Sequence, residues 1–522
     1  MSIPVDCKTE YLPMNSNTAH SFTNNKNAFP KKIFRKAYIR WQVIVHFLVF
    51  WFAFFIFKLG RWINGYFGDV TFDQVMFHIQ LGPQGLVEGD KKLFFSFIRF
   101  CVLGPMAMAL LLTIVVITIN FLLIKAERKQ VFPGRFANRA RILFNIVLPV
   151  ILIVLAVNNF LKRTNYWEYM AVKNNGTDYV RQMYVMPPLD KISVPKERRN
   201  LVMIYVESFE ATFQDKNLFG TNLQKSLSDI DTGVTSFAHY RQLYGTGWTI
   251  AGAVASQCGV PIKMGNRIGE YAEYFLPGAV CMGDVLKNAG YTNVFMQGVS
   301  LNFGAHGRFF HQHGFDELYG LEEWKEQGEP LSEWGLYDDR LFERAKERLD
   351  QLYQSNQPFN LTFMTIDTHG PEGLFSPTCS ARGVNDYAGI VSCTSDQLAE
   401  FVRYIRKKGY DRNTDVVIVG DHMSMMTPLH ATLEKSNDRS IFNQFISRRS
   451  LDKNRNDIVH FDVYPSVLYM LGFRFDEGRL ALGTSAFGPY NPRDSLFYVK
   501  DVDRKLRLPS EKYNSFWINM EK

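Results

Sequence analysis

The sequence is poor in cysteine and has no Cys-x-x-Cys spacing. Only six cysteines occur in 522 residues, so a metal site built on a cysteine cluster is not indicated. The chain also has no internal repeats and no low-complexity segments, so neither a repeat architecture nor a compositionally biased linker is expected. These absences leave an ordinary chain of several structural units, and its 46% hydrophobic residues are enough for a large core.

Positive charge is in excess but is not spread like a nucleic-acid-binding surface. The formal net charge is +8, and the basic residues gather beside hydrophobic stretches. Orientation in a membrane explains that placement better than binding of nucleic acid. We therefore expect no nucleic-acid partner.

Three long hydrophobic stretches lie before residue 162. They run approximately from Tyr38 to Phe57, from Phe94 to Ile124 and from Ile142 to Leu161, and each can cross a bilayer core of about 30 Å. The first and third are close to the minimum length, so a buried core helix is the alternative for either. A polar leader of more than thirty residues precedes the first stretch, which argues against a cleavable signal peptide.

Flanking charge predicts the direction of these spans, because positive residues favour the cytoplasmic side. Basic residues occur in the leader and after the second stretch, at Lys26, Lys31, Lys32, Arg35, Lys36, Arg40, Lys125, Arg128, Lys129, Arg135, Arg139 and Arg141. The loop between the first two stretches carries acidic residues, at Asp69, Asp73, Glu88 and Asp90. We expect a cytoplasmic leader over 1–37, about three spans within 38–163, and an exported remainder.

Four of the six cysteines fall in the exported part, as expected for disulfides. Short sequence separations favour Cys258 with Cys281 and Cys379 with Cys393, which is one of three possible connectivities. Cys7 lies in the leader and Cys101 in a span. A metal-binding cysteine cluster is the rival reading.

The exported part reads as a polar connector over 164–200 followed by an α/β domain over 201–522. Three apolar runs typical of central parallel strands cover Leu201–Val206, Asn360–Asp367 and Asp415–His422. Amphipathic helices are predicted between them, including Asp338–Tyr353, with Asp338 as its cap, and Ser395–Lys407. Strands that alternate with helices predict a mainly parallel sheet.

Each of the three strands ends in side chains that suit a divalent ion or a phosphate. Glu207 follows the first, Asp367 and His369 follow the second, and Asp421 with His422 ends the third. Carboxylate and imidazole together suit Zn²⁺ or Mn²⁺, and strand ends are where an α/β sheet builds its sites. Taken singly, each could be a helix cap or a surface turn, but three such ends in one domain favour a site.

The nucleophile candidate is Thr249, in the segment Tyr244–Pro261 (YGTGWTIAGAVASQCGVP). Gly245 and Gly247 would let the backbone approach a phosphate, and the helix that follows would stabilise an anion at its N-terminus. A threonine hydroxyl needs a metal or a base to act as a nucleophile. The plain structural alternative is that Thr249 is only an N-cap.

These motifs together resemble a known family. VESFE (residues 206–210), TGWTIAGAVASQCGVP, MGDVLKNAGY (282–291), HGFDELYG (313–320), EWGLYDD (333–339), DTHGP (367–371) and the pair Asp421-His422 resemble the phosphoglycerol transferases of the osmoregulated periplasmic glucan pathway. Those enzymes group with lipoteichoic acid synthases, phosphoethanolamine transferases and sulfatases in the alkaline phosphatase superfamily. The resemblance spans about Leu201 to Asp421; FGDVTFDQVMF (67–77), between two spans, also resembles a family element.

The resemblance implies an alkaline phosphatase-type (sulfatase-like) α/β domain in the periplasm, held by helices in a bacterial inner membrane. It implies a single divalent ion, Mn²⁺ or Zn²⁺ with Mg²⁺ as a further choice, held by Glu207, Thr249, Asp421 and His422. Thr249 would be the covalent nucleophile, and His369 would contact the phosphoryl group or protonate the leaving group. Substrate contacts are expected at Asp367 and at His306 or Arg308, although GAHGRFF (304–310) departs from the usual spacing. The four exported cysteines also match family cysteines, which supports the pairing above.

The function implied is transfer of glycerol phosphate from phosphatidylglycerol, the phospholipid donor, to a periplasmic glycan or another hydroxyl acceptor. The alternatives are a phosphoethanolamine transferase and a sulfatase-like phosphodiesterase. A sulfatase of the usual kind carries a Cys or Ser that becomes formylglycine, so the threonine in TGWTIAG argues against it. If the protein is not an enzyme, the alternative is a receptor that uses the fold only for binding.

Overall fold

A computed structural model describes residues 29–81, 91–173, 177–263 and 274–518, with side chains from Trp41 onward except at positions 81, 91 and 173. Most of the predicted leader, including Cys7 and Lys26, and the loop acids Glu88 and Asp90 lie outside the described residues. The chain divides into two compact units, 1–50 with 109–149 and 51–108 with 150–522.

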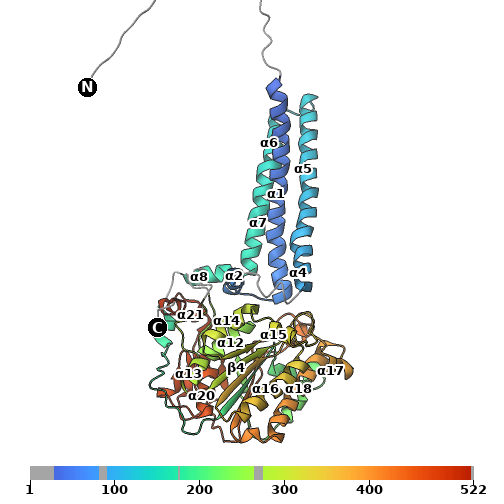
Figure 1. Cartoon of the computed structure of the whole chain (residues 1–522). Coiled ribbons are helices and arrows are strands. Elements are labelled where there is room, and N and C mark those ends of the chain that lie inside the picture. Colours follow the sequence, from blue (N-terminus) through green and yellow to red (C-terminus); the bar gives the residue numbers. More distant parts are fainter. Residues whose placement is uncertain (1–28, 82–90, 174–176, 264–273, 519–522) are drawn as a thin grey trace, which may run out of the picture. The chain divides into compact units, whose positions relative to one another are not determined.

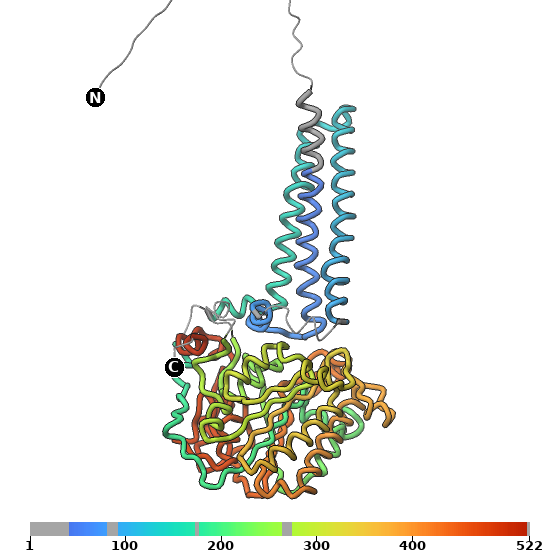
Figure 2. Tube along the Cα trace, in the orientation of Figure 1, coloured from blue at the N-terminus to red at the C-terminus, as the bar shows by residue number. Residues whose placement is uncertain are grey.

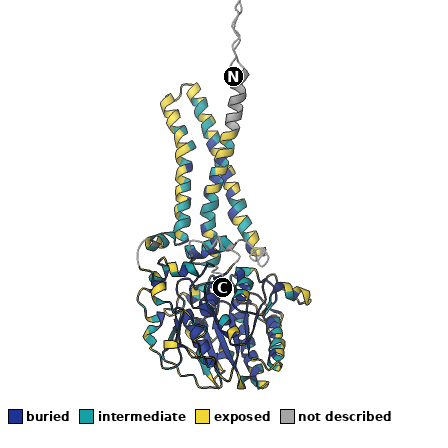
Figure 3. Cartoon of the chain, turned by 60° about the vertical axis from the view of Figure 1, so that its left-hand side comes forward, coloured by how far each residue is buried: buried dark blue, intermediate teal, exposed yellow. Residues whose placement is uncertain are grey.

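Three helical stretches are long and apolar enough to cross a membrane: Trp41–Phe67, Lys92–Arg128 and Gly134–Arg163. They contain the second and third predicted spans and the first from Trp41 onward, and few of their residues are buried (Figure 3). That exposure fits lipid-facing helices better than buried core helices, the alternative for the first and third stretches. The helices are α1 (Phe29–Phe67), α4 (Lys91–Phe97), α5 (Gly104–Arg128), α6 (Gly134–Ile142) and α7 (Leu148–Arg163), with π-helical turns at Ile98–Leu103 and Leu143–Val147.

The second unit contains a seven-stranded sheet in the order β2-β8-β7-β1-β6-β4-β5. Its strands are β1 (Asn200–Val206), β2 (Val234–Thr235), β4 (Thr292–Gln297), β5 (Glu317–Tyr319), β6 (Phe359–Met364), β7 (Thr414–Gly420) and β8 (Asn443–Ile446). The central pairs are parallel, while β8 runs antiparallel to β7 and β2. The prediction of a mainly parallel α/β sheet is therefore confirmed, and the three predicted strands are β1, β6 and β7.

Helices cover both faces of this sheet (Figure 1). One face packs against α12 (Thr249–Cys258), α13 (Met282–Asn288), α14 (His306–Gln312) and α20 (His460–Leu471). The other packs against α16 (Asp338–Gln354) and α18 (Tyr387–Lys407). Because β1, β6 and β7 are buried on both faces, their sequences are continuously apolar rather than alternating. The helix predicted at Ser395–Lys407 is the second half of α18.

Shorter elements complete the unit. The helices are α2 (Phe72–Leu81), α8 (Tyr166–Lys173), α9 (Tyr179–Met183), α10 (Lys216–Phe219), α11 (Lys225–Ser228), α15 (Leu321–Glu326), α17 (Pro377–Ala381), α19 (His430–Leu433), α21 (Val502–Arg507) and α22 (Glu511–Ser515). Two small sheets pair β3 (His239–Arg241) with β9 (Asp457–Val459), and β10 (Arg479–Leu480) with β11 (Gly483–Thr484).

The predicted connector is attached to the domain rather than separate from it. Val185 pairs with Ala481 and Ser193 with Arg474, so the segment drawn in green in Figure 2 lies along the red C-terminal region. The charged run before β1 ends in Arg199, whose guanidinium donates to both carboxylate oxygens of buried Asp415 at 2.9 and 2.6 Å. This paired geometry fixes where the first central strand begins.

Both predicted disulfides are confirmed, Cys258–Cys281 and Cys379–Cys393. Cys258 and Cys281 group with His313, as a metal site would. His313 instead contacts Asp284 and the Phe275 carbonyl, each at 3.0 Å, and thiols joined in a disulfide cannot bind a metal as thiolates. The rival reading of a cysteine metal cluster is therefore wrong for these residues.

One predicted detail of α16 is also wrong. Its N-cap is Tyr337, and Asp338 is its first residue. The Asp338 carboxylate accepts hydrogen bonds from the backbone N–H groups of Ile366 and Asp367, at 2.8 and 2.9 Å. It therefore holds the loop after β6 instead of capping its own helix.

Candidate active site

Three predicted ligands meet at the carboxyl ends of β1 and β7. These strands are parallel neighbours, with Val206 opposite Gly420, so the residues that follow them emerge side by side. His422 Nε2 lies 3.4 Å from Glu207 Oε1 and 3.3 Å from Asp421 Oδ2. One ligand atom from each of the three residues lies within 4.8 Å of the others.

Thr249 joins this group as the first residue of α12, and its hydroxyl donates to Glu207 Oε2 at 3.1 Å. The N-cap is Trp248, in extended conformation, so Thr249 is not the N-cap that the structural alternative required. Gly252, one turn later, is needed for this approach, because a Cβ there would lie 2.0 Å from the Asp421 carbonyl oxygen. The four side chains of the predicted ligand set are thus brought together.

The two glycines before Thr249 have a structural use, and their predicted approach to a phosphate stays a prediction. Gly245 has a φ of +77°, and a Cβ on it would lie 2.6 Å from the Ile262 carbonyl oxygen. A Cβ on Gly247 would lie 2.6 Å from Gln242 Nε2. Both glycines therefore allow close packing of the chain on itself, which accounts for them without a phosphate.

The cluster is electrostatically suited to a cation. Glu207, Asp421 and His422 are all at most 1% exposed, and Asp421 Oδ2 and His422 Nε2 have no hydrogen-bond partner among the described residues. Burial and the negative charge of Glu207 raise the pKa of Asp421 well above its usual range. Burial lowers the pKa of His422, but the charges of Asp421 and Glu207 outweigh it and raise that pKa to about 10. Two buried carboxylates and an imidazole with unsatisfied atoms fit a divalent ion.

A second set of contacts orients these ligands. Asp421 Oδ1 accepts from the backbone N–H groups of Ser208 and His422, both at 2.8 Å, and the Ser208 hydroxyl donates to Glu207 Oε1 at 2.6 Å. His422 Nδ1 donates to the Met423 carbonyl at 2.8 Å, so Nε2 is the ring atom that faces the carboxylates. Such outer contacts fix the tautomer and the direction of a ligand.

His369 lies at the edge of the site and is partly exposed. Its Nδ1 donates to the Gly370 carbonyl at 2.7 Å, and its ring is 4.5 Å from the Trp334 ring. It also lines a mainly apolar hollow with Tyr66, Phe67, Leu93, Ser208, Gly370, Pro371, Met425 and Met426. The hollow therefore joins the catalytic loops to the end of α1.

The remaining predicted contacts are placed less directly. Asp367 is buried, and its Oδ1 accepts from the Asp338 backbone N–H at 3.3 Å, so it faces Asp338 rather than the ligand cluster. His306 is 1% exposed and donates from Nδ1 to Gln297 Oε1 at 2.7 Å. Burial lowers the pKa of His306 to about 3, so it offers a neutral polar contact. Arg308 is partly exposed on the same helix. Their roles as substrate contacts stay predictions.

Several residues of the site were missed by the sequence reasoning. Ser208 and Asp338 act through hydrogen bonds that depend on how the backbone folds. The spacing of residues in the sequence does not reveal such contacts. Phe77, in α2, lies 6.0 Å from Trp248, ring to ring, and the resemblance of FGDVTFDQVMF to a family element was the one signal for it.

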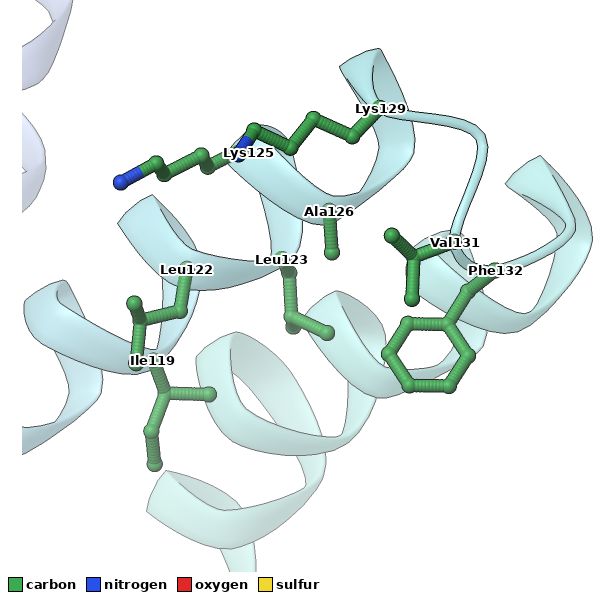
Figure 4. Close-up of a pocket in the computed structure, with 8 residues that line it drawn as sticks. All are labelled: Ile119, Leu122, Leu123, Lys125, Ala126, Lys129, Val131 and Phe132. Atoms are coloured by element: carbon green, nitrogen blue, oxygen red, sulfur yellow. The ribbon is translucent and has the colours of Figure 1, made fainter.

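A different hollow lies at the end of α5 (Figure 4). It is lined by Ile119, Leu122, Leu123, Lys125, Ala126, Lys129, Val131 and Phe132. Its lining is apolar apart from two lysines and contains no His, Cys, Asp or Glu that could bind a metal. The lysines instead fit a membrane boundary, where long basic side chains reach toward water.

Several known proteins are similar to part of this chain. A phosphoglycerol transferase I from Escherichia fergusonii is 33% identical over 350 residues, which cover 63% of this chain and 45% of that protein. Its namesake from Salmonella typhimurium is 34% identical over 351 residues, with the same coverage. The chain thus spans less than half the length of these relatives. The lipoteichoic acid synthase structure from Listeria monocytogenes aligns at 16% identity and a TM-score of 0.46, over 63% of this chain and 95% of that one.

The family model described as Sulfatase matches residues 199–473. That range begins just before β1 and contains every predicted site residue from Glu207 to His422. The chain therefore belongs to the sulfatase family.

Proposed function

We propose that this protein is a membrane-anchored phosphoglycerol transferase. It moves glycerol phosphate from phosphatidylglycerol to a glycan or another hydroxyl acceptor through a covalent intermediate on Thr249. The observation that carries the proposal is the 3.1 Å hydrogen bond from the Thr249 hydroxyl to Glu207, inside the Glu207, Asp421 and His422 cluster. The names of the relatives support the same reaction.

In the first step Thr249 passes its hydroxyl proton to Glu207 Oε2, its hydrogen-bond acceptor, while Oγ attacks phosphorus and the bond from phosphorus to the diacylglycerol oxygen breaks. Glu207 orients the hydroxyl through its hydrogen bond, and the first turn of α12 directs backbone N–H groups at the phosphoryl oxygens. A divalent ion, Mn²⁺, Zn²⁺ or Mg²⁺, held by Glu207, Thr249, Asp421 and His422 would lower the pKa of that hydroxyl and offset charge on the phosphoryl group.

His369 handles the proton of the leaving group. Because its Nδ1 is committed to the Gly370 carbonyl, Nε2 is the atom that gives a proton to the diacylglycerol oxygen. In the second step an acceptor hydroxyl attacks the same phosphorus and returns a proton to Nε2, the bond to Thr249 Oγ breaks, and Glu207 returns its proton to that oxygen. The exchange balances, and Thr249 and His369 are restored.

The hollow beside His369 supports a lipid donor. Its lining of Tyr66, Phe67, Leu93, Met425 and Met426 is mainly apolar and includes the end of the first span. These apolar side chains lie beside His369 and at the end of the first span, where the acyl chains of a lipid donor would approach the site. The charges that flank the spans support a domain on the periplasmic side of a bacterial inner membrane.

The test uses the full-length chain in detergent micelles that contain phosphatidylglycerol or phosphatidylethanolamine, with a divalent ion and a glycan acceptor. We expect diacylglycerol release and label transfer only from head-group-labelled phosphatidylglycerol. Thr249→Ala should lower the rate at least about 10³-fold, whereas Thr249→Ser keeps a hydroxyl and should retain measurable turnover. Release from phosphatidylethanolamine alone would show that the donor is wrong. An unaffected Thr249→Ala variant would show that the nucleophile is wrong.

A further inference from the structure

The turn that follows α5 folds back on the end of that helix. Gln130 has a φ of +56°, and the Val131 N–H donates to the Ala126 carbonyl at 3.0 Å. A left-handed residue followed by such a bond is a Schellman motif, in which the residue after the turn contacts the last turn of the helix. Val131 and Ala126 both line the hollow in Figure 4, called the α5 hollow below. The way in which α5 ends therefore builds this hollow.

The lining of the α5 hollow is largely apolar. Its volume is about 380 Å³, which is in the range of small-ligand sites. Leu122, Val131 and Phe132 line it, and all three are exposed. At the end of a membrane span, such side chains meet lipid chains, which are as apolar as leucine. An acyl chain therefore fits this lining.

Two lysines lie beside the apolar lining. Lys125 and Lys129 are four residues apart in α5 and so share one face of the helix, and Figure 4 shows both on the same side of the hollow. Glu127, between them in the sequence, pairs with Arg141. Neither lysine forms an ion pair with a residue whose side chain the structure describes. Both ammonium groups can therefore contact an anion from outside the chain.

The segment around the α5 hollow is strongly basic. Residues 125–141 contain six lysines and arginines and a single glutamate, which predicts that this end of the spans faces the cytoplasm. The lipid surface on the cytoplasmic side carries negative charge and attracts basic residues close to it. The charge and the apolar lining therefore match the same kind of molecule, a phospholipid with a negative head group.

We propose that the α5 hollow binds an anionic phospholipid of the cytoplasmic leaflet. Lys125 and Lys129 contact the phosphate of its head group, and one acyl chain packs against Ile119 and Phe132. The α5 hollow shares no residue with the hollow beside His369. The lipid is bound there without being converted, so the site does not depend on the proposed transfer reaction.

The experiment measures lipid binding to the full-length chain by native mass spectrometry, from micelles that contain phosphatidic acid or phosphatidylcholine with the same acyl chains. Phosphatidic acid is the probe because it is anionic and has no head group to transfer. We expect the wild type to bind phosphatidic acid at least about 10-fold more tightly than phosphatidylcholine. Lys125→Gln with Lys129→Gln should weaken binding of phosphatidic acid about 10- to 30-fold and leave that of phosphatidylcholine unchanged.

Two further variants separate the hollow from general attraction between charges. Ala126→Phe fills the hollow without a change of charge, and it should weaken binding of both lipids. Arg135→Gln with Arg139→Gln removes the same charge at exposed positions of α6 that do not line the hollow, and it should change the Kd for phosphatidic acid less than about threefold. Equal melting temperatures show that the variants fold. Comparison among variants removes any contribution from the catalytic site.

Several outcomes would overturn the proposal. Equal affinity of the wild type for the two lipids would remove the role of charge, and an equal loss in the two double variants would show that the attraction is not specific to the hollow. Unchanged binding in Ala126→Phe would place the lipid elsewhere. A wild-type dimer that Ala126→Phe separates, with lipid binding unchanged, would assign the hollow to a second copy of the chain. Binding seen only after removal of residues 1–28 would assign it to the leader.

Discussion

At the residue scale, the site brings two buried carboxylates and one imidazole close together. Asp421 Oδ2 and His422 Nε2 lack partners among the described residues, and burying like charges together is unfavourable unless a cation intervenes. The same arrangement leaves the Thr249 hydroxyl in contact with Glu207. The chemistry proposed for the site therefore depends on occupancy by a divalent ion.

Asp421→Asn tests that dependence. Without added metal, the variant should melt at or above the temperature of the wild type, because one buried charge is removed. With Mn²⁺ or Zn²⁺, the wild type should gain several degrees, since a ligand at a hundredfold excess over its Kd stabilises by about 2.7 kcal/mol. The variant should gain little. Melting curves and metal analysis measure both effects, and a gain equal to that of the wild type would contradict the ligand assignment. Asp229→Asn, at the surface, is the control.

Asp367 gives a prediction for pH dependence. Burial and the negative charge of Asp338 raise its pKa well above the usual range, so the folded chain holds a proton that the unfolded chain releases near pH 4. This contribution to stability is complete below about pH 4 and is lost as pH rises. Asp367→Asn should flatten the fall in melting temperature between pH 4.5 and 7.5. Parallel profiles for the variant and the wild type would contradict this account.

Individual site residues could be predicted where they directly follow a recognisable apolar strand. Glu207, Asp421 and His422 each follow an apolar strand directly, so a strand-end site could be expected from them. Asp338 could not be placed, because its carboxylate binds the backbone of a loop far along the sequence. The partners of Trp248 and His306 depend on tertiary packing in the same way.

At the element scale, the parallel register of β1 and β7 and the position of α12 assemble the site. The three central strands could be predicted from their continuous apolar runs. The edge strands could not, because two- and three-residue strands such as β2 and β5 have no periodicity to read. The packing of α2 into the catalytic unit could not be predicted either, because its sequence suggests only a loop between two spans.

The Cys258–Cys281 disulfide joins the end of α12 to the residue before α13. Replacing both cysteines by alanine should lower the free energy of unfolding by about 3 kcal/mol, as the chain-entropy estimate gives for a loop of this length. Activity should fall as well, because α12 carries Thr249. Denaturant melts of the full chain measure the first effect and phosphatidylglycerol turnover the second.

The matched control is the Cys379→Ala and Cys393→Ala pair, whose loop has a sequence separation of 14 rather than 23. It should lose similar stability but keep more activity, since neither cysteine lies in α12. Equal loss of activity in both double variants would contradict the claim that the Cys258–Cys281 disulfide positions α12 for activity.

At the scale of the whole molecule, three apolar helices and a sulfatase-family domain form one chain. The odd number of spans and the basic residues after the second one predict a domain on the periplasmic side. An alkaline phosphatase reporter should therefore be active when fused after Lys173 and inactive when fused after Lys129. The reverse pattern would overturn the predicted orientation.

The most direct test of the central claim is mass spectrometry of the peptide that contains Thr249. The full-length protein is mixed with labelled phosphatidylglycerol and a divalent ion, without acceptor, and is quenched in acid. We predict that a labelled glycerol phosphate appears on Thr249 and disappears when acceptor is added. Steady turnover of phosphatidylglycerol with no adduct on Thr249 under any quench condition, or an adduct on another residue, would contradict the account.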